Sequence, residues 1–312
     1  MRRLLPPPTA LLFLLVSQAC FVPPSGTRPG PSIVAATSVD SLRGRIITIA
    51  ATHPGADVAV YYHELTRPDS LAYNADVSYH AASTMKVPVM IELFKRVDSR
   101  TLSLDQTVPI ENSFASLADG SPFSLDRNGD SEVSLYTRIG RSATLSELNE
   151  LMIAHSSNFA TNILLKLLDP KTVNATAHAL GARHMTVLRG VEDDKAFEKG
   201  LNNTTTARDL GVLLTGIENG TAASRRSCAA MKAVLLRQVF NTEIPAGLPA
   251  GVQVAHKTGW ISGTLHDAAI VYPKSRPPYV LVVLTRNIAK EKEAQAMIAD
   301  ISSQVYAFNA SR

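Results

Sequence analysis

The sequence has few cysteines, few aromatic residues and no apolar run long enough to cross a membrane. Its 312 residues contain two cysteines, Cys20 and Cys228, and aromatic residues make up 6% of the chain. Two cysteines so far apart argue against the disulfide framework that stabilises small secreted scaffolds. The N-terminal apolar run, Thr9 to Val16, is too short to span a bilayer, so we expect no integral membrane protein.

The chain also lacks a large surplus of charge. The formal net charge is +4, and two of these charges are Arg2 and Arg3 near the N-terminus. A nucleic-acid-binding protein needs clustered positive charge, so we expect no nucleic-acid partner. Internal repeats and blocks of like charge are absent as well. An apolar content of 45% agrees with one enzyme-sized globular unit.

No group of residues has the spacing of a metal site. His80, His155 and His256 have no metal-ligand spacing, and we expect them to pack or to form hydrogen bonds. Asp126 to Glu132 resembles a calcium loop in composition but lacks the spacing to a distal glutamate, so it predicts a polar turn. We therefore expect neither a metal nor a cofactor.

The N-terminal segment predicts export. Residues 1–19 combine two arginines, an apolar run and the small residue Ala19, which is the pattern of a secretory signal peptide. Cleavage after Ala19 would leave Cys20 first, where a lipoprotein carries its acylated cysteine, although Ser17 stands where a larger aliphatic residue is usual. Residues 20–37 form a Pro/Gly-rich tether. We expect a periplasmic or secreted protein, either soluble or anchored in the membrane at Cys20.

Residues 38–312 predict one α+β domain. Helical periodicity covers 38–52, 145–154 and 289–308, and strand patterns cover 57–65, 71–73, 252–257, 264–272 and 279–284. The block between them, about 83–240, is mostly helical in pattern. This order predicts an α/β/α sandwich with a five-stranded antiparallel sheet, flanked by the N- and C-terminal helices, and an inserted all-helical lobe. A site would lie between the sheet and the lobe.

Ser83 and Lys86 form a Ser-x-x-Lys sequence where a turn leads into an apolar helix. A spacing of three residues places the hydroxyl and the ammonium group one turn apart on one helix face. A serine hydroxyl is a weak nucleophile at neutral pH and needs a positioned base, which Lys86 can be if its pKa is lowered. Ser83 is therefore the candidate nucleophile. By itself, this motif also fits a helix cap followed by a solvated lysine.

Two further motifs follow in order. Ser156-Ser157-Asn158 opens an apolar helical run, and Lys257-Thr258-Gly259 lies in a strand-like run near the C-terminus. Together with the Ser-x-x-Lys sequence they resemble the motifs of the class A β-lactamases and penicillin-binding proteins. The resemblance extends from about residue 38 to the C-terminus and implies the same fold.

The resemblance also implies roles for these residues. Ser156 would pass a proton to the leaving nitrogen, and Asn158 would bind the substrate amide and Lys86. Lys257 and Thr258 would bind the substrate carboxylate, and Gly259 would let the substrate backbone approach the strand. The backbone N–H groups of Ser83 and Trp260 would form the oxyanion hole.

The sequence departs from the family pattern at two positions. Ser157 stands where these β-lactamases usually carry an aspartate that braces the loop. Leu265 lies near the place of an arginine that assists carboxylate recognition, and Arg276 or Arg286 could replace that arginine.

A β-lactamase also needs a base that activates water against the acyl-enzyme. The corresponding loop, 188–206, holds two candidates, Glu192 and Glu198. Glu192 fits the family offset from Leu188 without a gap, whereas Glu198 matches a local Glu-x-x-Leu-Asn pattern but needs a larger deletion. We predict that Glu192 is the base.

These features predict a serine β-lactamase, a hydrolase of antibiotic resistance that forms an acyl-enzyme at Ser83 and acts as a monomer. One alternative is a penicillin-binding D-Ala-D-Ala peptidase that acts on a peptidoglycan stem peptide. Another is a lipid-tethered binding protein with a vestigial site. The rate of deacylation and covalent labelling of Ser83 distinguish the three.

Overall fold

The computed structural model describes residues 35–312. The predicted signal peptide and Cys20 lie outside the described residues, as does most of the predicted tether. Within residues 35–312, no helix is both long and apolar enough to cross a membrane.

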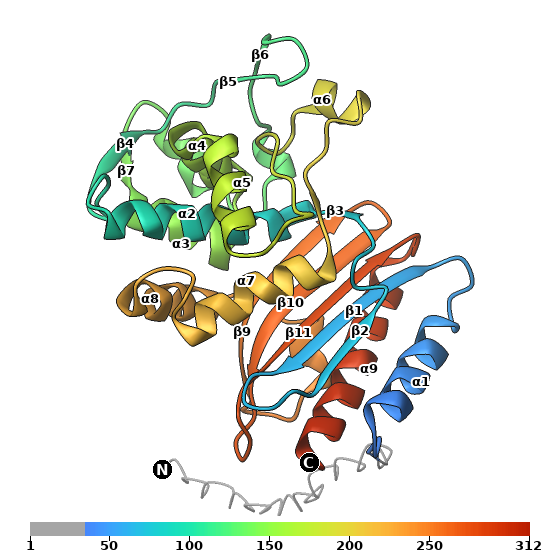
Figure 1. Cartoon of the computed structure of the whole chain (residues 1–312). Coiled ribbons are helices and arrows are strands. Elements are labelled where there is room, and N and C mark those ends of the chain that lie inside the picture. The colour runs from blue at the N-terminus through green and yellow to red at the C-terminus, as the bar shows by residue number, and fades with distance from the viewer. Residues whose placement is uncertain (1–34) are drawn as a thin grey trace, which may run out of the picture. The chain divides into compact units, whose positions relative to one another are not determined.

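The centre of the fold is a five-stranded antiparallel sheet in the order β2-β1-β11-β10-β9 (Figure 1). Its strands are β1 (Asp57–Glu64), β2 (Ser70–Tyr73), β9 (Gln253–Ile261), β10 (Thr264–Tyr272) and β11 (Tyr279–Arg286). The two strands from the start of the chain pair with the three from its end. The predicted sheet is confirmed, and β9 continues past the predicted residue 257 because residues 258–261 pair with β10.

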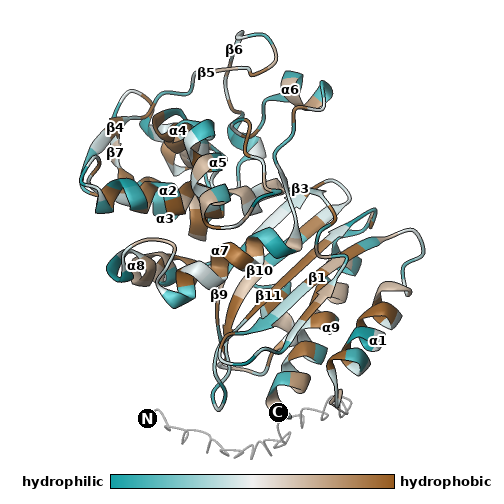
Figure 2. Ribbon diagram, in the orientation of Figure 1, coloured by the Kyte–Doolittle hydropathy of each residue, from teal (hydrophilic) through white to brown (hydrophobic). Residues whose placement is uncertain are grey.

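Two helices pack together on one face of the sheet. These are α1 (Val39–Ala50), which begins with a capping box between Ser38 and Ser41, and α9 (Glu291–Ala310). Figure 2 shows both as amphipathic, while β10 and β11 are largely hydrophobic. Leu281 and Val283 of β11 point into this helix-covered core, and their neighbours Val280 and Val282 enter the core on the opposite face.

Most of the chain between β2 and β9 forms the lobe, while the last helix of this segment packs against α9. The helices of the segment are η1 (Ala82–Met85), α2 (Lys86–Asp98), η2 (Arg127–Gly129), η3 (Ser134–Arg138), α3 (Leu145–Ala154), α4 (Asn158–Leu168), α5 (Pro170–Ala179), α6 (Asp194–Glu198), α7 (Ala207–Asn219), α8 (Arg225–Leu235) and η4 (Ile244–Gly247). α7 lies across the face of the sheet opposite α1 and α9 (Figure 1). The central helix, α2, is buried from residue 86 to residue 94.

The lobe also contains short strands. They form three two-stranded ladders: β3 (Tyr79–His80) with β8 (Thr204–Thr205), β4 (Thr107–Pro109) with β7 (Ser142–Thr144), and β5 (Phe114–Ala115) with β6 (Pro122–Phe123). The lobe is therefore mostly helical rather than all-helical. Strands of two or three residues are too short for an alternating pattern to reveal them in the sequence.

Candidate active site

Ser83 lies in η1, the turn that leads directly into α2. The preceding Ala82 has a φ of 45°, and its N–H donates to Nδ1 of His80 at 3.0 Å. Ser83 is partly exposed, while Lys86, the first residue of α2, is completely buried. The sequence thus places the hydroxyl at the surface of the cleft and the amine beneath it.

Lys86 connects the first motif to the second. Its Nζ donates to the carbonyl oxygen of Ser156 at 2.6 Å and to Oδ1 of Asn158 at 2.9 Å. It also lies 3.2 Å from the Ser156 hydroxyl. Burial, together with the nearby cation of Lys257, holds the pKa of Lys86 well below its ordinary value, while Asp130 and Glu192 oppose this shift. A lysine in this environment is suited to accept a proton.

Lys257 brings the third motif to the same hydroxyl. Its Nζ donates to Oγ of Ser156 at 3.0 Å and to its neighbour's carbonyl, that of Thr258, at 3.0 Å. Burial lowers the pKa of Lys257 to about 7, and the carboxylates of Asp267 and Glu243 act in the opposite direction. The Ser156 hydroxyl therefore lies between two buried amines, which leaves its own hydrogen free to donate to a substrate atom.

The edge strand β9 packs closely against the turn that holds Ser83. A Cβ added at Gly259 would lie 3.0 Å from the backbone nitrogen of Ser83 and 3.1 Å from that of Thr84. Both neighbours are backbone atoms, so a side chain at this position would force the strand or the turn to shift by a few tenths of an ångström. The next residue, Trp260, has a side chain that is 56% exposed at the cleft.

Of the two candidate glutamates, the structure places Glu192 beside the motif residues. Its Oε1 accepts a hydrogen bond from Nδ2 of Asn158 at 2.6 Å. Burial raises the pKa of Glu192; the hydrogen bond from Asn158 and the charge of Lys86 lower it, and the charge of Asp130 raises it further. Glu198 is exposed on the short helix α6.

Two cavities meet at Ser83. One, of about 310 Å³, is lined by Ser156, Thr258 and Trp260 together with Phe240, Thr242, Glu243 and Glu291. The other, of about 270 Å³, lies on the side of Glu192 and Asn158. Ser83, the candidate nucleophile, is thus accessible from the side of the third motif and from the side of the loop 188–206.

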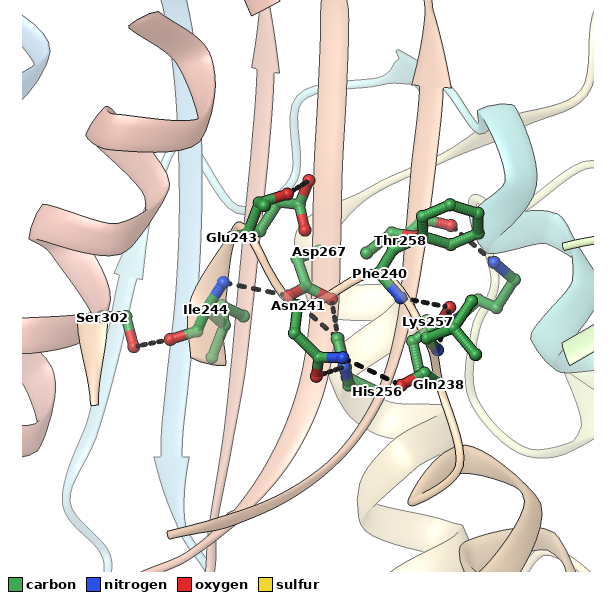
Figure 3. A network of polar contacts seen from close by, with 12 residues as sticks. Gln238, Phe240, Asn241, Glu243, Ile244, His256, Lys257, Thr258, Asp267 and Ser302 are labelled. Carbon is green, nitrogen blue, oxygen red and sulfur yellow. Dashed lines mark hydrogen bonds and ion pairs between the residues drawn. The ribbon is translucent and has the colours of Figure 1, made fainter. Parts of the chain in front are cut away.

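A polar network supports the wall of the first cavity (Figure 3). Buried His256 contacts the Asp267 carboxylate through Nδ1 at 3.0 Å, and Oδ2 of Asp267 accepts the N–H of Ile244 at 3.1 Å. The Ser302 hydroxyl of α9 donates to the Ile244 carbonyl at 2.8 Å. These contacts hold the end of the loop 238–244 against β10 and α9.

Glu243, in this same loop, was not identified from the sequence. It is 3% exposed, and the Thr242 hydroxyl donates to its Oε1 at 2.9 Å, whereas Oε2 has no hydrogen-bond partner. Burial, with Asp267 as the second cause, raises its pKa. A carboxyl group therefore borders the cavity that Thr258 also lines.

The arginines proposed from the sequence as carboxylate ligands lie elsewhere. Nε of Arg286 pairs with Asp57 at 2.7 Å, and its guanidinium stacks on the ring of Tyr79 at 4.8 Å. Arg276 is in the connection between β10 and β11. Among the described residues, neither arginine lines the two cavities at Ser83, although Leu265 does line the first.

A second residue that the sequence did not reveal, Asp130, caps α4. It follows η2 in the predicted polar turn, is 9% exposed, and accepts the backbone N–H groups of Asn158 and Phe159. The signal in the sequence was indirect. Ser157 stands where the family usually has an aspartate, so the negative charge of that aspartate is either absent here or supplied by another residue.

Comparison with known proteins agrees with this architecture. The model of the β-lactamase enzyme family matches residues 41–308. A β-lactamase of Amycolatopsis lactamdurans is 30% identical over 278 residues, which cover 87% of this chain and 86% of that protein.

Two solved structures show the same fold. PBP-A is 26% identical with a TM-score of 0.74, and the match covers 88% of this chain and 98% of that one. A class A β-lactamase from Mycobacterium abscessus is 22% identical with a TM-score of 0.73, covering 85% of this chain and 98% of that one. With the family model matching most of the chain, we conclude that this protein belongs to the β-lactamase enzyme family.

Proposed function

We propose that this protein is a serine β-lactamase that opens the β-lactam amide through an acyl-enzyme at Ser83. The observation that carries this proposal is the Ser156 hydroxyl held by both Lys86 and Lys257 in the cavity that also contains Ser83. This arrangement joins a nucleophile, a buried base and a proton donor. A serine hydrolase uses all three to break an amide bond.

Acylation uses these groups in sequence. Lys86, neutral because its pKa is lowered, takes the proton of the Ser83 hydroxyl as Oγ attacks the lactam carbonyl carbon. The backbone N–H groups of Ser83 and Trp260 receive the developing oxyanion, each contributing about 3 kcal/mol. The C–N bond then breaks, and Ser156 gives its proton to the ring nitrogen and is reprotonated from the lysine side.

Lys257 and Thr258 bind the substrate carboxylate. Buried Lys257 donates from Nζ to the carbonyl of Thr258, the residue that lines the cavity, and to the hydroxyl of Ser156, which also lines it. A cation in a low-dielectric site attracts an anion far more strongly than one in water. Asn158 then orients the substrate amide while it holds Lys86.

Glu192 is the base for deacylation in this scheme. Its carboxylate takes a proton from water, the hydroxide oxygen attacks the ester carbonyl, and Ser83 leaves with a proton returned to its oxygen. The support is geometric, because Glu192 shares the Asn158 side chain with Lys86 and borders a cavity that contains Ser83. Nothing equivalent supports Glu198, which is exposed.

Separating the two half-reactions tests the proposal. Glu192→Gln keeps the size of the side chain but cannot accept a proton, so it should still be acylated by benzylpenicillin and accumulate the adduct, visible by intact mass. Glu198→Gln is the matched control and should turn over within about threefold of the wild type. Ser83→Ala should give neither adduct nor turnover.

Three outcomes would contradict this proposal in part or in whole. Labelling of the Ser83→Ala variant at another residue would exclude the nucleophile. Accumulation of the adduct in Glu198→Gln instead would show that Glu198 is the base. A wild-type adduct that persists for hours would favour the penicillin-binding peptidase.

We further propose that the enzyme works outside the cytoplasm, either as a soluble protein or anchored by a lipid at Cys20. The support is the pattern of residues 1–19 and the Pro/Gly-rich residues 20–37. The mass of the mature N-terminal peptide from the wild type and from Cys20→Ser checks this. A free, unmodified N-terminus at Cys20 or elsewhere would exclude the lipid anchor.

A further inference from the structure

A buried carboxylate outside all three motifs holds the segment that carries the second one. Oδ1 and Oδ2 of Asp130 lie 2.9 Å and 3.0 Å from the backbone nitrogen of Asn158, and Oδ2 accepts the N–H of Phe159 at 2.9 Å. These are the first two N–H groups of the eleven-residue helix α4, which its own backbone cannot satisfy. The negative charge also complements the positive end of that helix.

The remaining contacts of Asp130 are donors as well. The Tyr136 hydroxyl donates to Oδ2 at 3.1 Å, the Ser157 hydroxyl approaches the same oxygen at 3.4 Å, and the N–H of Glu132 donates to Oδ1 at 3.2 Å. Asp130 forms no ion pair with a lysine or arginine among the residues that the structure describes. Its charge is therefore balanced by hydrogen bonds and the helix end.

The residue that Asp130 fixes is the one that connects the two proposed bases. Asn158 accepts from Lys86 at 2.9 Å through Oδ1 and donates to Glu192 at 2.6 Å through Nδ2. Because Asp130 holds the backbone of Asn158, the starting point of the Asn158 side chain is fixed. Ser156, two residues earlier, has a φ of 58°, a strained conformation that needs such support.

We propose that Asp130 is a positioning residue for acylation: it supplies, from the turn after η2, the buried negative charge that Ser157 lacks at the centre of the second motif. The inference rests on the acylation mechanism proposed above. Asp130 does not touch the substrate; it acts through Asn158 and Ser156 on Lys86. The site needs one buried carboxylate beside the N-terminus of α4. It does not matter which residue of the sequence supplies that carboxylate.

The charge of Asp130 leaves an electrostatic signature that a purely structural residue would not. Lys86 is faced by Lys257, which lowers its pKa, and by Asp130 and Glu192, which raise it. Replacing Asp130 with asparagine removes one of the two raising charges, so the pKa of Lys86 should fall further. The acid limb of the pH profile of acylation should then move to lower pH, even though the rate at its plateau falls.

A double-mutant cycle tests the proposal. Asp130→Asn should lower the rate constant of acylation by benzylpenicillin at least about tenfold, the scale of a misplaced catalytic group. Ser157→Asp alone places two carboxylates in a completely buried site and should lower the thermal midpoint. The double variant has one carboxylate again, at a position that already caps Ala160 at 3.2 Å. It should acylate within about threefold of the wild type.

Asp126→Asn is the matched control. Asp126 is an exposed aspartate of the same turn whose side chain caps Asn128, so its replacement removes the same charge without touching α4. Acylation should be unchanged within about threefold. A folded Asp130→Asn variant with wild-type acylation and an unshifted pH profile would overturn the proposal.

If the Asp130→Asn variant does not fold, the double variant provides the test. A folded double variant that acylates like the wild type supports the proposal, whereas losses that simply add overturn it. Absence of acylation in the wild type would instead contradict the proposed function. That result separates a failure of the proposed function from a failure of the role proposed for Asp130.

Discussion

At the scale of single residues, three strained backbone positions lie where the proposed chemistry occurs. Among residues 35–312, seven non-glycine residues have a positive φ, and Ala82, Ser156 and Glu192 are three of them. This conformation costs an L-residue about 1–2 kcal/mol. Contacts with His80, Lys86 and Asn158 hold these three in place. His80 therefore supports the turn that precedes Ser83.

The lowered pKa of Lys257 predicts that binding of anionic substrates depends on pH. Its pKa of about 7 lies below the ordinary value of 10.5, so the cation is lost as the pH rises through about 7. We expect the dissociation constant of benzylpenicillin, measured with Ser83→Ala to prevent acylation, to increase at least about tenfold between about pH 6 and pH 9. Binding should be tightest on the acid side of this range.

The methyl ester of the same penicillin is the control for this measurement. It lacks the carboxylate, so its dissociation constant should stay within about threefold over the same pH range. Equal pH dependence for the acid and the ester would show that Lys257 does not bind the carboxylate.

Sequence reasoning reached some of these residues and not others, for a physical reason. Ser83, Lys86, Asn158 and Lys257 belong to local motifs whose spacing suggests their chemistry. The roles of Asp130 and Glu243 depend on which loop packs against which helix or strand, and no local pattern encodes that contact. The polar turn around Asp130 was predicted correctly, but its contact with Asn158 was not.

At the scale of elements, the site depends on how closely one strand approaches one turn. β9 carries Lys257 and Thr258 and lies directly against η1, which carries Ser83. A side chain at Gly259 would force the strand or the turn to shift. The close packing of β9 on η1 therefore fixes where Ser83 lies relative to Lys257 and Thr258.

Gly259→Ala should damage both activity and stability. The added Cβ would lie 3.0 Å from the Ser83 nitrogen, so the strand or the turn must shift. We expect kcat/KM to fall at least about 100-fold and the free energy of unfolding to drop by about 1–3 kcal/mol. Steady-state kinetics and chemical denaturation measure the two effects.

Gly44→Ala provides the contrast. Gly44 lies within α1, and its added Cβ would meet nothing within 4 Å. Alanine in a helix interior should raise the free energy of unfolding by about 0.5–1 kcal/mol and leave kcat/KM unchanged. An active Gly259→Ala variant would mean that the contact between β9 and η1 is looser than the geometry indicates.

The elements themselves were largely predictable because their patterns are periodic. The terminal helices and the five strands follow from apolar spacing, and Thr144 caps the predicted helix at 145–154, its hydroxyl oxygen accepting the N–H of Glu147. The extension of β9 to Ile261 was missed because its last residues are paired by β10 rather than marked by alternation. Tertiary pairing overrides local preference at such ends.

At the scale of the whole molecule, the described residues form two hydrophobic cores that share one sheet. The core under α1 and α9 contains Phe308 and the β11 side chains Leu281 and Val283. The core between the sheet and the lobe contains Phe159 and the alternate β11 residues. Because β11 belongs to both, loss of either core should destabilise the same sheet, but only the second core lies beneath the site.

Two phenylalanine truncations should separate stability from activity. Phe159 and Phe308 are both completely buried, so replacing either with alanine should cost about 3–5 kcal/mol and lower the thermal midpoint by roughly 5–10 °C.

Phe159 also packs on Tyr136, at 4.8 Å between ring centroids, and its N–H is held by Asp130. Phe159→Ala should therefore reduce acylation at least about tenfold, measured well below its midpoint. Phe308→Ala, whose ring packs on Tyr62 across the other face of the sheet, should keep kcat/KM within about threefold. Equal losses of activity in the two folded variants would show that the sheet transmits damage from either core to Ser83.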